Sequence, residues 1–211
     1  MIAGKQPAPQ WLNMEMAARH AATGISAWEW AGTDNHDPEV VLACAGDVPT
    51  LEAMAAVTVL RDWAPDLRLR MVNVIDLFTL EPSDEHPHGL HNEDFNRLFT
   101  KDKPVIFAFH GYPTVVHKLI YKRTNHDNFH VHGYKEEGTT TTPFDMTVLN
   151  ELDRYTLALD AIRYVPRMKE RVPEMVQRHS EVLQRHKLYV SEHGQDMPEV
   201  LNWKWSARVD G

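Results

Sequence analysis

The sequence predicts an α/β fold, a three-layer domain in which helices cover both faces of a mostly parallel sheet, with further helices at the C-terminal end. Short apolar runs rich in β-formers alternate with stretches of helical periodicity. These runs are residues 40–45, 67–76, 105–109 and 129–131. At 211 residues, with 43% apolar and 25% charged side chains, the chain is long enough to bury a sizeable core.

The first 76 residues are expected to form two helices and two strands. Residues 10–23 give a short helix. The run VVLACA at 40–45 is apolar throughout, which is typical of a strand buried on both faces. Pro49 fits the first turn of an alanine-rich helix over 49–64, because its missing N–H costs nothing there. Alternating apolar residues then predict the strand over 67–76.

The middle of the chain combines a polar loop with two short helices. Residues 78–92 are predicted to be the loop, and 93–99 a helix capped by Asn92. A helix over 112–123 follows the strand 105–109, with its basic residues toward the C-terminal end, where they favour the helix dipole.

The last third is predicted to be helical. Thr142 and Pro143 form a helix-start signature, in which Thr142 caps, Pro143 occupies the first turn and Asp145 reaches back as in a capping box. This helix is expected to continue to about Tyr164. A long helix over 173–192 follows, also opened by a proline.

Composition excludes several classes of protein. The net charge of −8 and pI of about 5.9 argue against a nucleic-acid surface, which would present a basic face. The single cysteine, Cys44, lies in an apolar run, forms no internal disulfide and suits the cytoplasm. No apolar stretch approaches the length of a membrane span, and no secretory signal is recognised. Residues 1–12 are interpreted as an interdomain linker and 13–211 as one domain, a fragment of a longer protein.

A candidate site lies at the carboxyl ends of the strands, where parallel sheets bind their ligands. The segments expected at that edge are Gly46-Asp47, Asp76, His110-Gly111-Tyr112 and His132-Gly133-Tyr134. The strand-end or interface site is therefore predicted to contain His110, Tyr112, His132 and Tyr134. The four threonines at 139–142 are interpreted first as caps and second as interface contacts.

Histidines are the second candidate, since eight of thirteen lie between residues 86 and 132. The triplet at 86, 88 and 91 lies in a loop with Pro87 and Gly89, so a solvated loop is favoured over a metal site. His130 and His132 share one strand face and are a ligand pair, a proton relay or, as favoured here, a hydrogen-bonded interface pair. His179 and His186 lie on an apolar helix stripe and are interpreted as partly buried packing residues.

Complete catalytic motifs are missing from the sequence. There is no GxSxG, no P-loop, no GxGxxG, no HExxH and no Cys/His zinc spacing. A Gly-Asp-Gly motif with the asparagines that hold the magnesium of thiamine diphosphate is missing too. No catalytic residue and no metal ligand is therefore assigned.

Five segments together resemble a known family. They are residues 4–9 (GKQPAP), 45–50 (AGDVPT), 72–74 (VNV), 110–146 and 152–155 (LDRY). They are similar to the C-terminal domain of phosphoketolases, which belong to the thiamine diphosphate-dependent transketolase group. The resemblance covers nearly the whole chain, and the stretch NHDNF…GYKEEGTTTTPFDM is its most specific part.

The resemblance implies a transketolase C-terminal-domain-like fold and a lyase of carbohydrate metabolism. Phosphoketolases cleave xylulose 5-phosphate, and often fructose 6-phosphate, with inorganic phosphate to acetyl phosphate and an aldose phosphate. Thiamine diphosphate and Mg²⁺ are bound by the N-terminal and middle domains, at an active site between partner subunits of a homodimer. The present chain would be structural, would bind no cofactor and would be inactive alone. No nucleic-acid or membrane partner is implied.

One residue is given a role in substrate binding by the resemblance. The family has a lysine in a Gly-Lys-Gln context that helps hold the substrate phosphate, and Lys5 matches it. An ammonium group on a flexible stem is a good phosphate partner. The alternative is a solvated linker lysine. For the chain as a whole, the alternatives are a free-standing regulatory module that binds an anion or nucleotide, and a histidine-based metal hydrolase.

Overall fold

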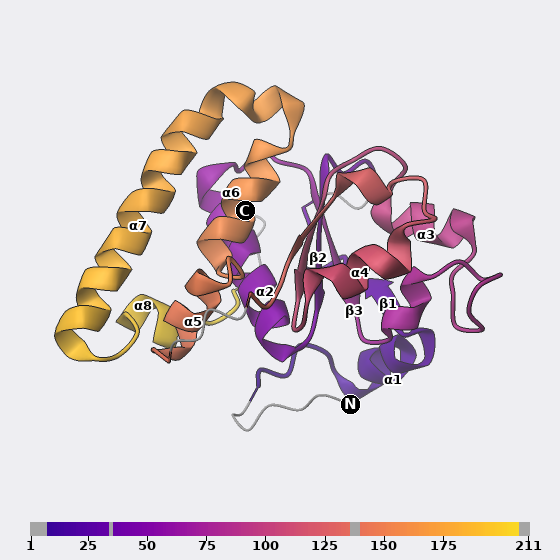
Figure 1. The fold of residues 1–211 in the computed structure, drawn as a ribbon, viewed down its shortest axis with the longest axis horizontal. Helices are drawn as coiled ribbons and strands as arrows, with labels where there is room; N and C mark the ends of the chain where they lie inside the picture. The colour runs from indigo at the N-terminus through magenta and orange to yellow at the C-terminus, as the bar shows by residue number, and fades with distance from the viewer. Residues whose placement is uncertain (1–7, 34–35, 136–139, 207–211) are drawn as a thin grey trace.

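The computed structural model describes residues 8–33, 36–135 and 140–206. At its centre is a five-stranded sheet in the order β1-β3-β2-β4-β5 (Figure 1). The parallel strands are β2 (Val40–Ala45), β3 (Leu69–Val74), β4 (Val105–Phe109) and β5 (Phe129–His132). The short β1 (Ile25–Ala27) pairs with β3 in the antiparallel direction. The predicted α/β fold with a mostly parallel sheet is confirmed.

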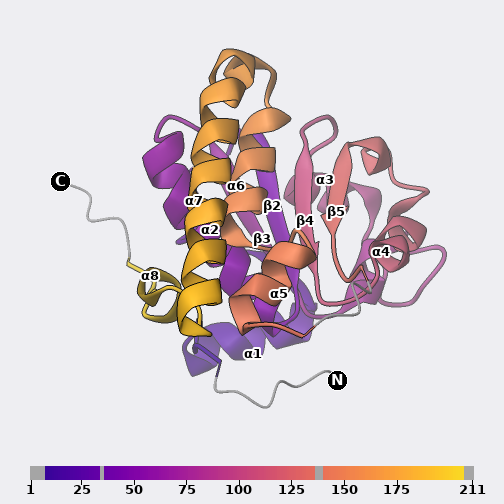
Figure 2. The ribbon, with the colours of Figure 1, turned by 60° about the vertical axis from the view of Figure 1, so that its left-hand side comes forward.

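Helices cover both faces of this sheet. One face is packed by α2 (Asp47–Trp63) and α6 (Arg154–Arg163), and the long α7 (Val172–His193) lies outside α6, after the 3₁₀ turn η3 (Pro166–Arg171) (Figures 1 and 2). The other face is packed by α3 (Asn92–Phe99) and α4 (Pro113–Ile120) (Figure 2). Each face therefore has its own apolar core.

The alternation of side chains along β2 divides these two cores. Val40, Leu42 and Cys44 belong to the cluster under α2 and α6. The residues between them belong to the cluster under α3 and α4. All six residues of β2 are buried, which confirms the prediction of a strand covered on both faces.

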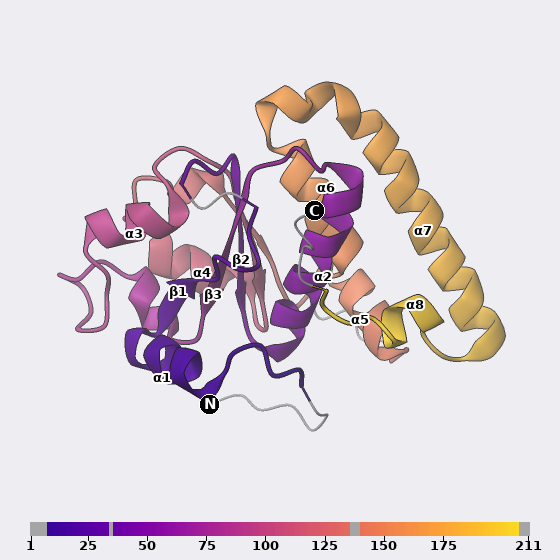
Figure 3. The same ribbon diagram turned by 180° about the vertical axis from the view of Figure 1, so that it is seen from behind.

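Short elements complete the fold. They are α1 (Met14–Thr23), α5 (Pro143–Leu149), α8 (Pro198–Leu201) and the 3₁₀ turns η1 (Leu77–Leu80) and η2 (His126–Asn128). The Asn13 side chain caps α1, and Gly24 ends it in the left-handed conformation at φ 72°. The Gly24 carbonyl accepts hydrogen bonds from the amides of Ile75 and Asp76, so α1 ends beside the carboxyl end of β3 (Figure 3). The sequence interpretation missed β1, η1 and α8.

The predicted single helix from 142 to 164 is wrong, because the chain turns between α5 and α6. Glu151 has a positive φ of 54°, and the amide of Leu152 bonds back to the carbonyl of Thr147. The Asp153 carboxylate then accepts from the amides of Tyr155 and Thr156. Aspartate competes well for free amides at a helix start, so it begins a new helix here.

Two predicted caps are also wrong. The start of α5 is held by Asp196, which accepts from the Phe144 amide at 3.0 Å and from the Thr142 hydroxyl, whereas no bond from Asp145 closes a capping box. Asn92 is the first residue of α3, and its side chain accepts from the buried Arg123 at 2.8 Å. At α5 a residue distant in sequence takes the capping role, whereas at α3 the expected cap is itself bound by a distant residue and no side chain caps the helix.

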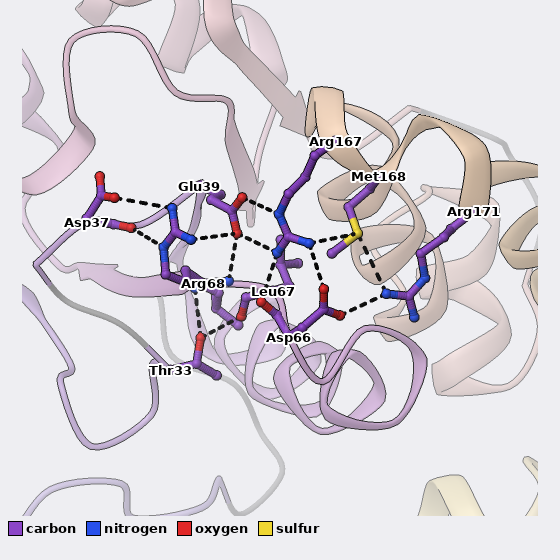
Figure 4. A network of polar contacts seen from close by, with 10 residues as sticks. Thr33, Asp37, Glu39, Asp66, Leu67, Arg68, Arg167, Met168 and Arg171 are labelled. Atoms are coloured by element: carbon purple, nitrogen blue, oxygen red, sulfur yellow. Dashed lines mark hydrogen bonds and ion pairs between the residues drawn. The ribbon is translucent and has the colours of Figure 1, made fainter.

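Charged residues join the amino ends of β2 and β3 to η3 (Figure 4). Asp66 accepts from Arg167 at 2.6 Å and from Arg171 at 2.8 Å. Glu39 accepts from Arg167 at 2.7 Å, and lies 3.7 Å from Arg68. Hydrogen bonds from Arg167 lower the pKa values of Glu39 and Asp66 below their ordinary range. This acidic and basic cluster anchors the C-terminal helices at the end of the sheet opposite to the candidate site.

Within the described part of the chain, no helix combines the length and apolarity needed to cross a bilayer. The boundary between a linker at 1–12 and a domain at 13–211 stays a prediction.

Candidate functional site

A pocket of about 510 Å³ opens at the carboxyl edge of the sheet, between the start of α2, the end of β4 and α5. Its walls are mainly apolar or aromatic. They comprise Val48, Pro49, Phe109, Tyr112, Tyr134, Pro143, Met146 and Leu152, with His110, Gly111, Thr147 and Asn150. We call it the strand-end pocket.

Two Gly-Tyr turns form one side of the strand-end pocket and interlock. The Tyr134 amide donates to the Gly111 carbonyl at 2.9 Å. A Cβ on Gly133 would lie 2.3 Å from that same carbonyl oxygen, so only glycine allows this approach. The rings of Tyr112 and Tyr134 meet edge to face with centroids 5.6 Å apart. They remain 47% and 45% exposed, so a rigid backbone presents two aromatic rings to solvent.

His110 lies on the rim of the pocket and faces the first turn of α2. Its Nδ1 is 3.0 Å from Asp47 Oδ1. Gly46, at φ 112°, allows this approach, since a Cβ there would lie 2.5 Å from the His110 Cβ. Asp47 also accepts from the Val48 amide at 2.8 Å. A carboxylate therefore already occupies the amino end of α2, which opposes the binding of an anion there.

The pocket brings together three of the four predicted site residues, His110, Tyr112 and Tyr134, and their role stays a prediction. His132 is not among the lining residues, because its Nε2 lies 3.1 Å from Asp160 Oδ2 on α6. His130 stacks on Tyr164 at 3.4 Å between centroids, and burial lowers its pKa. The two rings share a strand face as predicted, each contacts a different residue of the chain, and their role as an interface pair stays a prediction.

The rings of His86 and His88 meet edge to face at 5.3 Å between centroids, but the three loop histidines also have separate partners. His88 Nδ1 is 2.6 Å from Asp76 Oδ2, His91 Nδ1 is 2.9 Å from Ser83 Oγ, and His86 stacks on Phe78. Throughout the described ranges, no three or more His, Cys, Asp or Glu side chains are grouped so that they could hold a metal ion.

A buried polar chain that the sequence interpretation missed runs across the sheet. The Ser26 hydroxyl lies 2.8 Å from His20 Nδ1, and His20 Nε2 lies 2.7 Å from Asn73 Oδ1. Asn73 Nδ2 donates to Thr50 Oγ1 at 3.0 Å, and that hydroxyl donates to the Gly46 carbonyl at 2.6 Å. Asn73, a polar residue inside a strand that is buried at every position, was the sequence signal that could have revealed it.

Cys44 lies next to this chain and is buried, as predicted. Burial raises the pKa of its thiol to about 11, so it remains a protonated thiol at neutral pH. A second pocket of about 480 Å³ borders this polar chain at His20 and Ser26, and it is lined by Leu12, by residues of α1 and by the segment from Ser26 to Trp30.

The remaining predicted residues divide between the described and undescribed parts of the chain. Lys5 and Thr139 lie outside the described residues. Thr142 precedes α5, but its hydroxyl donates to Asp196 and makes no capping bond to the helix, so the predicted capping role is wrong. His186 is fully buried against Phe144, and His179 Nε2 is 3.0 Å from the Thr156 hydroxyl, so both are packing residues.

The fold and the site together define a class: an α/β domain with a rigid aromatic pocket at its strand ends and, within the described residues, no assembled metal site. Residues 5–205 match the model of the XFP C-terminal domain, and the chain belongs to this family.

The curated relatives have one name in common. The chain is 59% identical over 207 residues to a probable phosphoketolase of Rhodopseudomonas palustris (strain HaA2), which covers 98% of this chain and 26% of that protein. It is 59% identical over 210 residues to one of Bradyrhizobium diazoefficiens, and 58% identical over 209 residues to one of Rhodopirellula baltica. These matches cover 99% of this chain and 26% of each protein. The chain thus spans about a quarter of the length of the relatives it matches.

Proposed function

We propose that this chain is the C-terminal domain of an enzyme that cleaves xylulose 5-phosphate, and fructose 6-phosphate in members that accept it, with inorganic phosphate. The products are acetyl phosphate and an aldose phosphate. The observation that carries the proposal is the match of residues 5–205 to the C-terminal family model, together with 59% identity to probable phosphoketolases. We place the enzyme in the cytoplasm, in agreement with a single, buried cysteine.

The same proposal makes the chain inactive alone. Its strand-end pocket is mainly apolar, and the Asp47 carboxylate on the rim would repel a diphosphate. Thiamine diphosphate and Mg²⁺ are therefore assigned to the preceding domains of a homodimeric longer protein. This domain would support those domains and contribute Lys5 as a ligand of the substrate phosphate.

The test compares this chain with the longer protein at equal molar concentration. Both receive thiamine diphosphate, Mg²⁺, xylulose 5-phosphate and inorganic phosphate, and acetyl phosphate is measured as its hydroxamate. We expect product from the longer protein only, and no heat of thiamine diphosphate binding to the chain in calorimetry. Hydroxamate above background from the chain alone would refute its inactivity, and none from the longer protein would refute the proposed reaction.

Lys5→Ala in the longer protein is the second arm of this test. Loss of a charged phosphate contact should raise the KM for the sugar phosphate. Lys5→Arg keeps the positive charge, so its KM should lie between that of Lys5→Ala and that of the unmodified protein. The matched control is Lys122→Ala, because Lys122 pairs with Glu85 on the surface of the described domain. Equal KM values for Lys5→Ala and the unmodified protein would remove Lys5 from the phosphate site.

A further inference from the structure

Exposed apolar side chains are concentrated at one edge of the domain. Large apolar side chains are exposed at twelve described positions, and six of these follow closely on the carboxyl end of a parallel strand. We call these six residues the strand-end patch: Val48 after β2, Ile75 and Phe78 after β3, Tyr112 and Val115 after β4, and Tyr134 after β5. Because the four strands run parallel, their carboxyl ends share an edge, and the patch lies along it.

The strand-end patch has the anatomy of a protein interface. Three of its residues, Val48, Tyr112 and Tyr134, line the strand-end pocket, and the interlocked turns hold the two tyrosines in place before any partner arrives. Preorganised aromatic side chains beside a pocket are typical anchor points of interfaces, because little conformational entropy is lost when they are covered. The pairs His110–Asp47 and His88–Asp76 supply polar groups beside the apolar centre.

We propose that the strand-end patch is the surface on which the preceding domains of the longer protein dock, with one of their apolar side chains inserted into the strand-end pocket beside Tyr112 and Tyr134. This inference rests on the proposed function only in taking the chain as one domain of a longer enzyme.

Two observations favour this occupant over others. The chain covers 26% of its relatives and matches a C-terminal family model, so most of the polypeptide of those relatives lies before it. The first helix also lies at this edge: α1 ends at Gly24, whose carbonyl accepts from the amides of Ile75 and Asp76 directly after β3. A domain that precedes α1 is therefore covalently tethered near the patch, and tethering raises its effective concentration there.

Tyrosine nitration by tetranitromethane, quantified by mass spectrometry, tests the proposal. We expect Tyr112 and Tyr134 to react in the isolated chain and at least tenfold more slowly in the longer protein. Tyr121 is 60% exposed at the C-terminal end of α4, is not one of the six patch residues and should react equally in both. Equal rates for Tyr112 and Tyr134 in the two proteins would overturn the proposal.

Two further measurements distinguish domain docking from self-association and from a failure of the proposed reaction. Light scattering gives the mass of the isolated chain, and a dimer that already protects both tyrosines would assign the patch to a second copy and overturn the proposal. Acetyl phosphate formation is measured on the same longer protein. An active enzyme with unprotected tyrosines contradicts the docking surface alone, whereas protected tyrosines in a protein that forms no acetyl phosphate contradict the reaction alone.

Variants in the longer protein add a second readout. Tyr112→Ser combined with Tyr134→Ser should increase hydrogen exchange of β4, α4 and α5 at least tenfold, because the edge is uncovered. The matched Tyr→Phe pair keeps the rings and should remain protected, and Tyr121→Ser should change nothing at this edge. Circular dichroism of the isolated chain with the same two serines shows whether the domain itself still folds. Unchanged exchange in a folded Tyr→Ser variant would contradict docking through these rings.

Discussion

The tautomer of neutral His20 is fixed by its neighbours. Asn73 donates its amide protons to Thr50 and Cys44, so its Oδ1 faces His20 and must accept. His20 therefore carries its proton on Nε2, and Nδ1 accepts from Ser26. Protonation would require the Ser26 hydroxyl to turn and accept from Nδ1, and burial is the main cause that lowers the His20 pKa.

We predict that long-range ¹H–¹⁵N NMR finds His20 as the Nε2–H tautomer, with a pKa below its ordinary value of 6.5. Because the folded pKa is below the unfolded one, the unfolded chain binds more protons as the pH falls. The stability that comes from keeping His20 neutral is therefore fully present above pH 6.5 and is lost as the pH falls below that value. An imidazolium at pH 6.5, or an Nδ1–H tautomer, would contradict the assignment. The chain unfolded in urea, titrated in the same way, provides the reference.

At the scale of elements, a buried ion pair joins α2 to α6. Both side chains are almost fully buried, and Arg154 donates to Glu52 through Nε at 2.9 Å and Nη2 at 2.7 Å. The backbone amide of Arg154 also donates to Glu52 at 2.9 Å. The geometry is bidentate, so each charge compensates the other in a site that water does not reach.

We predict that Arg154→Met alone lowers the free energy of unfolding by about 3–5 kcal/mol, because it leaves the Glu52 carboxylate buried and unpaired. Combining it with Glu52→Leu should recover most of that loss. The measurement is a double-mutant cycle from urea unfolding. Additive effects of the two substitutions would show that the pair does not act as a unit. Arg185→Ala, which removes an exposed pair with Glu199, is the matched control and should cost less than about 1 kcal/mol.

For the molecule as a whole, the cluster in Figure 4 connects the sheet to the C-terminal helices and makes that connection sensitive to acid. Arg167 lowers the pKa of Glu39 from its ordinary 4.5 and of Asp66 from its ordinary 3.8. The stability that comes from these lowered pKa values is fully present above the ordinary pKa values of Glu39 and Asp66. It is lost as the pH falls through the lower pKa values that the two groups have in the folded protein.

We predict that the free energy of unfolding decreases as the pH falls below about 5, and that Arg167→Ala flattens this decrease. At neutral pH the substitution should cost only about 1 kcal/mol, since Arg167 and Asp66 are partly exposed to water and salt. Urea unfolding at several pH values, with and without added salt, measures both effects. An equal slope below pH 5 in the variant would show that other carboxylates cause the acid sensitivity.

The sequence predicted the sheet well because its strands are defined locally. The bounds of β2 and β4 agree with the predicted runs, since a continuous apolar run of five or six residues has no stable place except between two helical layers. The helices of the last third were less predictable. Asp153 and Asp196 act as caps in the folded chain, and only Asp153 lies near the helix start that it stabilises.

The position of the candidate site was predictable from the sequence, but the set of residues that line it was less so. Parallel strands place their carboxyl ends on one edge, so His110, Tyr112 and Tyr134 could be grouped from their place after β4 and β5. His132 could not be separated from them, because α6 covers one face of β5 through contacts distant in sequence. The hydrogen-bonded polar chain that runs from Ser26 to Gly46 also joins residues that are far apart in sequence.

The sequence by itself determined the α/β class, the buried strands, the edge that holds the site and the family, because these depend on local patterns of apolar residues and on motifs. Only the tertiary structure decided which polar side chains are partners. Glu52 with Arg154, Arg123 with the loop before α3, and Asn73 with His20 and Thr50 are all contacts between separate elements. A buried polar group must find a partner wherever the fold brings one within reach, and sequence spacing carries no information about that distance.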